Sequence, residues 1–285
     1  MDADPLILVL LALFGLLGGI GITAVGPGGV LPTIGMFLLT PLSPSGVAGT
    51  AIATHVATGA LGTVAYTRSG QLREARTRRT ALLLSATALV GAPLGVLFNT
   101  LVGGRVFAIL LASAVALTGV LVWVREHRTS SAAAGAGAAG GEGNGRSEHG
   151  SSEHGGSEHG GPEHGGRDLH PVLTTAVGLV VSVAAGLFGL GGPMLSVPLL
   201  VVCGVPLLPA LAAAQAQSVV IAGAGTLGYL AHGSIDWALA ALVGVPELAG
   251  VLIGWKIAHA VPVRQLKYAL AGTLLALAPY LALHG

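Results

Sequence analysis

The chain has 285 residues, of which 53% are hydrophobic and only 9% are charged, and its formal net charge is +1. A soluble domain carries about 25% charged residues, so this composition excludes a large soluble protein. Basic residues are not interleaved with aromatic ones, which argues against a nucleic-acid-binding surface. Cys203 is the only cysteine, so an intrachain disulfide and a cysteine-based metal cluster are excluded as well.

Long apolar runs divide the chain into candidate membrane segments. Each run is close to the ~20 residues that a helix needs to cross the hydrocarbon of a bilayer. Polar stripes with a period of about 3.6 residues, which a soluble helical protein would need, are not found in them. The runs are Leu6–Val25, Val47–Tyr66, Ala81–Val102, Val106–Val124, Val172–Leu190, Leu207–Leu230, Trp237–Ala258 and Tyr268–Leu283. They predict an all-α polytopic protein of the cell membrane.

A glycine-rich sequence occurs twice, at Gly26–Gly29 and at Gly189–Gly192, 163 positions apart. The same separation relates further pairs: Gly15 and Gly178, Thr33 and Ser196, Gly62-Thr63 and Gly225-Thr226, Tyr66 and Tyr229, Gly70 and Gly233. Beyond these the separation becomes 159, which aligns Gly91, Gly95 and Arg105 with Gly250, Gly254 and Arg264. Glycines four apart favour close helix packing. A duplication with a glycine-rich break in each half is typical of a membrane transporter whose site lies between the repeats.

Residues 126–170 differ in composition from the rest of the chain. Ser, Ala, Gly, Glu and His dominate, and a Ser-Glu-His-Gly sequence recurs from Ser147 onward. Such a segment cannot bury enough apolar area to offset its ordering entropy, so a disordered linker is predicted. Weak metal binding by its histidines is the alternative. The expected domains are a first membrane repeat over 1–125, the linker over 126–170 and a second membrane repeat over 171–285.

Each half is expected to contain about five membrane segments, one of them short. The short segments cover 30–39 and 194–202, follow the glycine-rich breaks, and reach about halfway through a bilayer at ~1.5 Å per residue. Half-helices, re-entrant pieces and tilted crossings are all compatible with this length. The loop after the third segment is rich in arginine in the first half, whereas its counterpart Ala231–Asp236 has none. The positive-inside rule then favours inverted halves with the linker in the cytoplasm, and parallel halves are the alternative.

The two glycine-rich breaks are the first candidates for a binding site. Non-helical backbone survives inside a membrane only where protein or a wet cavity surrounds it, and glycine leaves its N–H groups uncovered. Because each break precedes a short helix, exposed N–H groups and a helix N-terminus would together bind a small anion. The candidate residues are Gly26, Gly28, Gly29, Thr33, Gly189, Gly191, Gly192 and Ser196. Tight turns that only pack helices are the alternative.

Polar residues in the segment after each break extend this candidate site. Thr54 and His55 in the first half align with Gln217 and Ser218 in the second, and Gln215 lies half a turn earlier. Side-chain donors of this kind would suit the path of a hydrated anion. For threonine the alternative is a hydrogen bond to the backbone of its own helix.

His55 and Glu247 are the candidates for proton coupling. Ionisable residues inside a membrane are costly, and by default they indicate a functional site. The alternatives are a neutral histidine bonded to a neighbouring helix, and a glutamate that is paired or bonded to backbone freed by Pro246. Glu247 aligns with Ala88, so this feature is not duplicated.

Three other polar residues are expected at the membrane boundary. Tyr66 and Tyr229 end the third segment of each half, and we expect them to be interfacial anchors. Asn99 lies near the end of a segment, and we expect it to be solvated.

With its paired breaks and the Gly-Thr-x-x-Tyr ends of the third segments, the chain resembles the TauE/SafE sulfite-exporter family, also called the 4-toluenesulfonate uptake permease family. The motif that carries the resemblance best is Gly189–Pro193 followed by Pro198. Where the family has a third consecutive glycine, this chain has Val30 in the first half and Pro193 in the second. The resemblance implies a secondary transporter that moves sulfite, other sulfur-containing anions or organosulfonates by alternating access, with proton coupling as one option.

The expected partners are a small anionic substrate and the lipid bilayer, and a homo-oligomer is left open. The alternative functions are an anion channel and a membrane subunit of a larger complex. An enzyme is not expected, because His55, His232 and His259 are scattered and have no nucleophile–base spacing. No cofactor and no resident metal site are expected.

Overall fold

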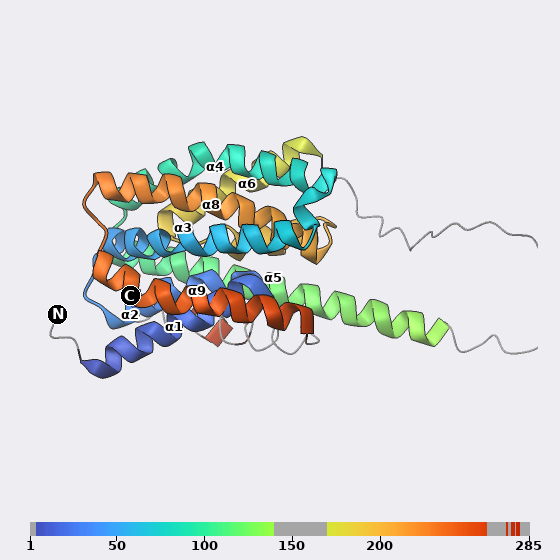
Figure 1. The fold of residues 1–285 in the computed structure, drawn as a ribbon, viewed down its shortest axis with the longest axis horizontal. Helices are drawn as coiled ribbons and strands as arrows, with labels where there is room; N and C mark the ends of the chain where they lie inside the picture. Colours follow the sequence, from blue (N-terminus) through green and yellow to red (C-terminus); the bar gives the residue numbers. More distant parts are fainter. Residues whose placement is uncertain (1–3, 140–169, 261–271, 273–274, 277, 280–285) are drawn as a thin grey trace, which may run out of the picture.

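The computed structural model describes residues 4–139, 170–260, 272, 275–276 and 278–279. These residues form helices without strands, and the long helices lie side by side (Figure 1). Seven described helices are long and apolar enough to cross a membrane: α1 (Pro5–Ala24), α3 (Pro44–Arg68), α4 (Ala75–Leu101), α5 (Gly104–Ala139), α6 (Pro171–Phe188), α8 (Leu207–Ala231) and α9 (Trp237–Ala260). The shorter pieces are η1 (Pro27–Gly29), α2 (Val30–Leu39), η2 (Gln71–Arg73) and α7 (Pro193–Val202). The predicted all-α polytopic fold is confirmed.

Large apolar side chains cover much of the outer surface of the helix bundle. Leu82 and Leu101 on α4 are 64% and 77% exposed, and Leu227 on α8 is 69% exposed. Apolar side chains that are spread this widely over the outside of a helix bundle indicate contact with lipid rather than with water. The polar candidate-site residues on α3 and α8, in contrast, are buried inside the bundle.

Helix α5 extends into the first residues of the expected linker, 126–170. Helix α5 does not end near Val124 but continues to Ala139. The physical reason is the alanine content of this stretch, since alanine has the highest helix propensity of all residues. The rest of the expected linker, 140–169, lies outside the described residues. So do Arg264 and most of the predicted last segment, Tyr268–Leu283.

In the first half, the short helix α2 folds back along α1. A Cβ atom placed on Gly18 would meet the ring of Pro32, and one placed on Gly35 would meet the ring of Phe14. The later α1 residue, Gly18, meets the earlier α2 residue, Pro32, and the earlier α1 residue, Phe14, meets the later α2 residue, Gly35, so the two helices are antiparallel. The break at Val25–Gly29 is therefore the tip of a helical hairpin, and it is buried. In the second half α6 and α7 flank the buried break Gly189–Gly192 in the same order.

The two halves pack against each other reciprocally. Helix α1 of the first half packs against α9 of the second, and α6 of the second half packs against α4 of the first. The Gly-x-x-x-Gly pairs lie in these two interfaces. A Cβ on Gly95 would run into the backbone of α6 at Val183, and one on Gly254 would run into the backbone of α1 at Ile20. Their predicted role in close helix packing is confirmed.

Helices α3 and α8, which occupy equivalent places in the two halves, cross each other in opposite directions at the centre. Gly49 lies against Tyr229, near the start of α3 and the end of α8, whereas Gly62 lies against Gln215, towards the other ends of both helices. Figure 1 shows the two helices next to each other. Inverted halves require both this antiparallel crossing and the reciprocal packing of α1 with α9 and of α4 with α6.

Candidate functional site

The two glycine-rich breaks lie together in the interior. Gly26 and Gly189 occupy equivalent places in the breaks and have φ angles of 110° and 72°, which only glycine adopts without strain. Thr33, in the first turn of α2, donates a hydrogen bond from Oγ1 to the carbonyl oxygen of Gly189 at 3.4 Å. A Cβ on Gly26 would lie 3.0 Å from the Cβ of Val197 on α7. The two glycine-rich breaks and the short helices that follow them therefore form one contiguous region.

His55 projects from α3 between the two breaks. Its Nε2 atom lies 3.1 Å from the carbonyl oxygen of Gly29 in the first break. A Cβ on Gly191 in the second break would lie only 3.2 Å from the Cδ2 atom of the same ring. The histidine side chain is fully buried. His55 is thus an ionisable group that contacts both glycine-rich breaks.

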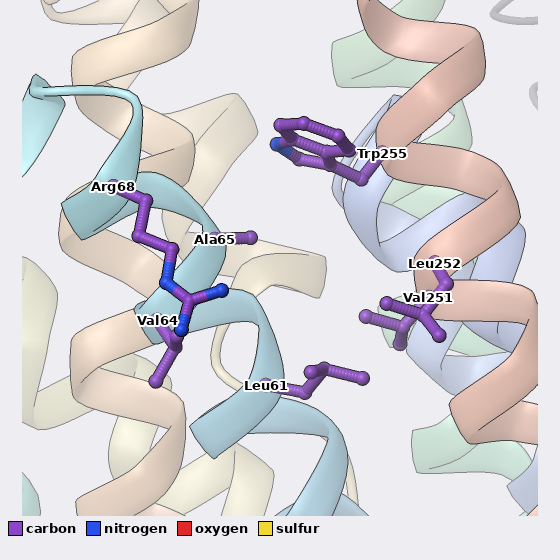
Figure 2. Close-up of a pocket in the computed structure, with 7 residues that line it drawn as sticks. All are labelled: Leu61, Val64, Ala65, Arg68, Val251, Leu252 and Trp255. Carbon is purple, nitrogen blue, oxygen red and sulfur yellow. The ribbon is translucent and has the colours of Figure 1, made fainter.

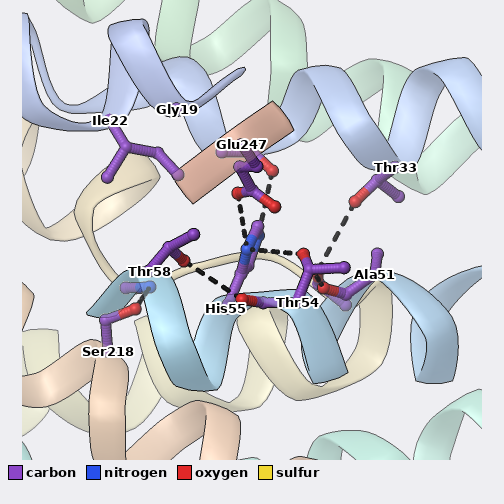
Figure 3. Close-up of polar contacts among 12 residues, drawn as sticks. Gly19, Ile22, Thr33, Ala51, Thr54, His55, Thr58, Ser218 and Glu247 are labelled. Atoms are coloured by element: carbon purple, nitrogen blue, oxygen red, sulfur yellow. Dashed lines mark hydrogen bonds and ion pairs between the residues drawn. The ribbon is translucent and has the colours of Figure 1, made fainter. Parts of the chain in front are cut away.

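Glu247 on α9 pairs with His55, although the two residues come from opposite halves of the chain. The Oε1 atom of Glu247 lies 3.0 Å from Nδ1 of His55, and neither side chain is exposed. The Oε2 atom of Glu247 has no hydrogen-bond partner among the described residues. Both candidates for proton coupling therefore belong to a single pair in the membrane interior (Figure 3).

The hydrogen bonds around His55 fix where protons lie. The Gly29 carbonyl can only accept, so Nε2 carries a proton. Thr54 donates its hydroxyl proton to the carbonyl oxygen of Ala51 at 2.9 Å, so it has none to give to Nδ1 at 3.3 Å. Two lone pairs facing each other at 3.0 Å would repel, so the contact between Nδ1 and Glu247 needs one shared proton. The pair with this proton is neutral overall.

Ser218 holds the place in the second half that His55 holds in the first. Its Oγ atom accepts a hydrogen bond from the backbone N–H of Gly192 at 3.3 Å. His55 donates to Gly29 and Ser218 accepts from Gly192, across the same sequence separation of 26 residues. Equivalent positions in the two halves therefore carry a donor to the first glycine-rich break, His55, and an acceptor from the second, Ser218.

Gln217 and Ser196 bind each other and the neighbouring helix. Ser196 Oγ donates to Gln217 Oε1, and Gln217 Nε2 donates to Ser182 Oγ at 3.1 Å and to the Gly178 carbonyl at 3.4 Å. These contacts link α6, α7 and α8, and they occupy both ends of the amide. In this conformation the two residues stabilise the packing of α6 and α7 against α8.

Gln215 reaches across the centre of the molecule. Its Nε2 atom lies 3.5 Å from the carbonyl oxygen of Ile22 at the end of α1, and its Oε1 atom has no partner in the described part of the chain. Gln215 lies against Gly62, and at the equivalent place in the other half Ile52 lies against Gly225. Of these two equivalent contacts, one is therefore made by the polar side chain of Gln215 and the other by the apolar side chain of Ile52.

Gly28, the remaining predicted site residue, packs against the backbone of Gly21.

Three boundary residues predicted from the sequence are in fact buried. Tyr66 is fully buried and donates from its hydroxyl group to the carbonyl oxygen of Thr23 at 3.0 Å. Tyr229 does the same to Gly186 at 2.7 Å, so neither is an interfacial anchor. Asn99 is 2% exposed and donates to the Leu187 carbonyl at 2.7 Å, so it is not solvated. Each side chain satisfies a carbonyl group that the end of a broken helix leaves without a helical partner.

A cavity that sequence reasoning missed lies between α3 and α9. Its volume is about 170 Å³, and it is lined by Leu61, Val64, Ala65, Arg68, Val251, Leu252 and Trp255. Figure 2 shows the α3 side chains facing those of α9 across this space. No sequence signal pairs these two helices, because they lie in different halves. The cavity begins one helical turn from Glu247, at Val251.

The comparison with known families agrees with this architecture. A family described as "Sulfite exporter TauE/SafE" matches residues 11–281, nearly the whole chain, including both breaks, His55 and Glu247. No curated protein and no solved structure matches the chain. The matched family consists of membrane transporters, and the seven described apolar helices fit a multi-pass protein of the cell membrane. The chain therefore belongs to the sulfite exporter TauE/SafE family.

Proposed function

We propose that this protein is a secondary transporter that moves a small sulfur-containing anion, such as sulfite or an organosulfonate, by alternating access. The observation that supports this best is the position of His55, which contacts both glycine-rich breaks and pairs with Glu247. An anion between the breaks would meet backbone N–H groups, two helix N-termini and one imidazole. The family assignment supports transport of this substrate class.

Proton coupling follows from the charge of the site. The pair of His55 and Glu247 with one shared proton is neutral, so it attracts an anion only weakly. A second proton, placed on the glutamate, leaves a net charge of +1 beside the bound anion. Anion and proton then stabilise each other in a region of low dielectric, and each increases the affinity for the other. The expected mode is transport of the anion together with a proton.

The inverted arrangement of the halves is part of this proposal. Alternating access around a fixed site is the usual mechanism of transporters built from inverted repeats. The antiparallel crossing of α3 and α8 and the reciprocal helix packing support it. The arginine-rich loop that contains Arg73 and Arg76 would face the cytoplasm.

The test is uptake of labelled sulfite, thiosulfate, sulfate and taurine into proteoliposomes, with and without a pH gradient. We expect saturable flux of at least one of these anions. We expect its uptake to be faster when the outside of the vesicle is more acidic than the lumen. Flux that rises linearly with concentration would indicate a channel instead. If none of the four anions moves faster than in protein-free vesicles, the assignment to sulfur anions is wrong.

A further inference from the structure

The cavity between α3 and α9 has the form of a wedge that opens away from the candidate site. Near the site the helices touch: a Cβ on Gly244 would lie 3.3 Å from Thr54, and His55 pairs with Glu247 at 3.0 Å. Further along both helices the cavity separates Ala65 from Trp255 (Figure 2). The closed end of the wedge is therefore the histidine–glutamate pair.

The wide end of the wedge has a cationic rim. Arg68, near the end of α3, lines the cavity, and Figure 2 shows its guanidinium group beside Val64. The rest of the lining is apolar, apart from the indole nitrogen of Trp255. A positive charge at the mouth of an apolar cleft raises the local concentration of anions.

The duplication defines a second groove that is equivalent to the first. The separations of 163 and 159 relate α3 to α8 and α9 to α4, so Ala65 corresponds to Gly228 and Trp255 to Val96. In this second groove the helices do not separate. A Cβ on Gly228 would lie 3.1 Å from a methyl group of Val96 and 3.4 Å from its Cβ. Helix α8 also packs more extensively against α4 than α3 does against α9.

We propose that the α3–α9 and α8–α4 grooves are the two alternating access paths to the site, and that this structure has the first open and the second closed. The inference rests on the proposed transport function, and it adds the route and the gating contact. Equivalent interfaces of inverted repeats lie towards opposite membrane faces, so exchanging their conformations reverses the accessible side. In the reverse state Trp255 closes against Ala65, and Val96 leaves Gly228.

The mouths of the two paths differ in charge, and this difference indicates at which mouth an anionic ligand is concentrated. Arg68 at the first mouth corresponds to Ala231 at the second. Small anions are therefore collected on the side of Arg68, whereas Ala231, at the equivalent position of the second mouth, carries no charge. A protein with this asymmetry favours loading from the arginine side.

Two cysteine pairs in a Cys203→Ser background test the proposal. The pair Val96→Cys with Gly228→Cys places its Cβ atoms about 3.4 Å apart, close to the spacing of a disulfide. The pair Ala65→Cys with Trp255→Cys spans the open cavity. Oxidation is followed by counting free thiols with a maleimide polymer on denaturing gels, and anion flux is measured before and after reduction. The reduced form of each double variant is its own matched control.

We expect the 96–228 pair to oxidise readily and the 65–255 pair to oxidise slowly. We also expect the 96–228 disulfide to reduce flux at least about tenfold, with recovery on reduction. Equal oxidation of both pairs, or a 96–228 disulfide that leaves flux unchanged, would overturn the proposal. If the cysteine-free protein transports no sulfur anion, the proposed function fails, while the oxidation rates still decide which groove is open.

Discussion

At the scale of single residues, His55 combines contacts that come from separate parts of the chain. Its Nε2 atom is held by the first break, its Cδ2 edge lies against the second break, and its Nδ1 atom faces Glu247. Here the paired glutamate still has an oxygen without a partner among the described residues. That free acceptor is where a second proton would be placed.

Arg68 should affect the recruitment of substrate rather than its passage. We expect Arg68→Gln to raise the KM for the transported anion by up to about fivefold at low salt with little change in kcat, because an exposed charge contributes about 0.2–1 kcal/mol. Added salt should shrink the difference, since it screens the charge. The control is Arg79→Gln, which removes another exposed arginine that does not line the cavity. A lower kcat with an unchanged KM would contradict this role.

At the scale of helices, small residues decide which surfaces touch. The interfaces of α4 with α6 and of α1 with α9 depend on glycines whose missing side chains admit the neighbouring backbone. Transmembrane association relies on such close contact, because lipid tails offer helices no hydrophobic driving force to associate. The interface of α3 with α9, by contrast, carries Leu61, Leu252 and Trp255 and contains a cavity. We infer that the first two interfaces move as units and that the third can open and close.

Gly95→Ala should destabilise the protein. The added methyl group would run into the backbone of α6 near Val183 and Leu187, and overpacking of this kind costs about 1–3 kcal/mol. The matched control is Gly223→Ala, also within a membrane helix, where a Cβ would meet nothing within 4 Å. Thermal unfolding in detergent should show a lower Tm for the first variant and an equal or higher Tm for the second. Equal Tm values for both variants would mean that the α4–α6 contact is not tight.

At the scale of the whole molecule, two similar halves meet at one asymmetric candidate site. One tyrosine contact recurs in both halves: Tyr66 with Thr23 and Tyr229 with Gly186, each over 43 residues. The chemistry does not recur, because a histidine stands opposite a serine and Glu247 aligns with Ala88. A duplicated framework supports two equivalent conformations, and a single ionisable pair would couple both to the proton.

The packing role of the paired glycines could be predicted from the sequence because glycines in helix contacts are constrained by the neighbouring backbone. The partner of Glu247 could not be predicted, since His55 lies in the other half and only the packing of α3 against α9 brings them together. The burial of Tyr66 and Tyr229 could not be predicted for a related reason. A tyrosine near a helix end is typical of an interfacial anchor, and the sequence does not reveal that a broken helix ends beside it.

Proton coupling through His55 and Glu247 is tested most directly by measuring proton movement during anion transport in proteoliposomes that contain a pH-sensitive dye. With an inward anion gradient, the wild-type protein should acidify the lumen as the anion enters. Glu247→Gln can still donate a hydrogen bond to Nδ1 of His55 but cannot release a proton. It should therefore retain anion exchange and lose acidification. Anion uptake by the wild-type protein without acidification, or unchanged acidification in Glu247→Gln, would contradict coupling through this pair.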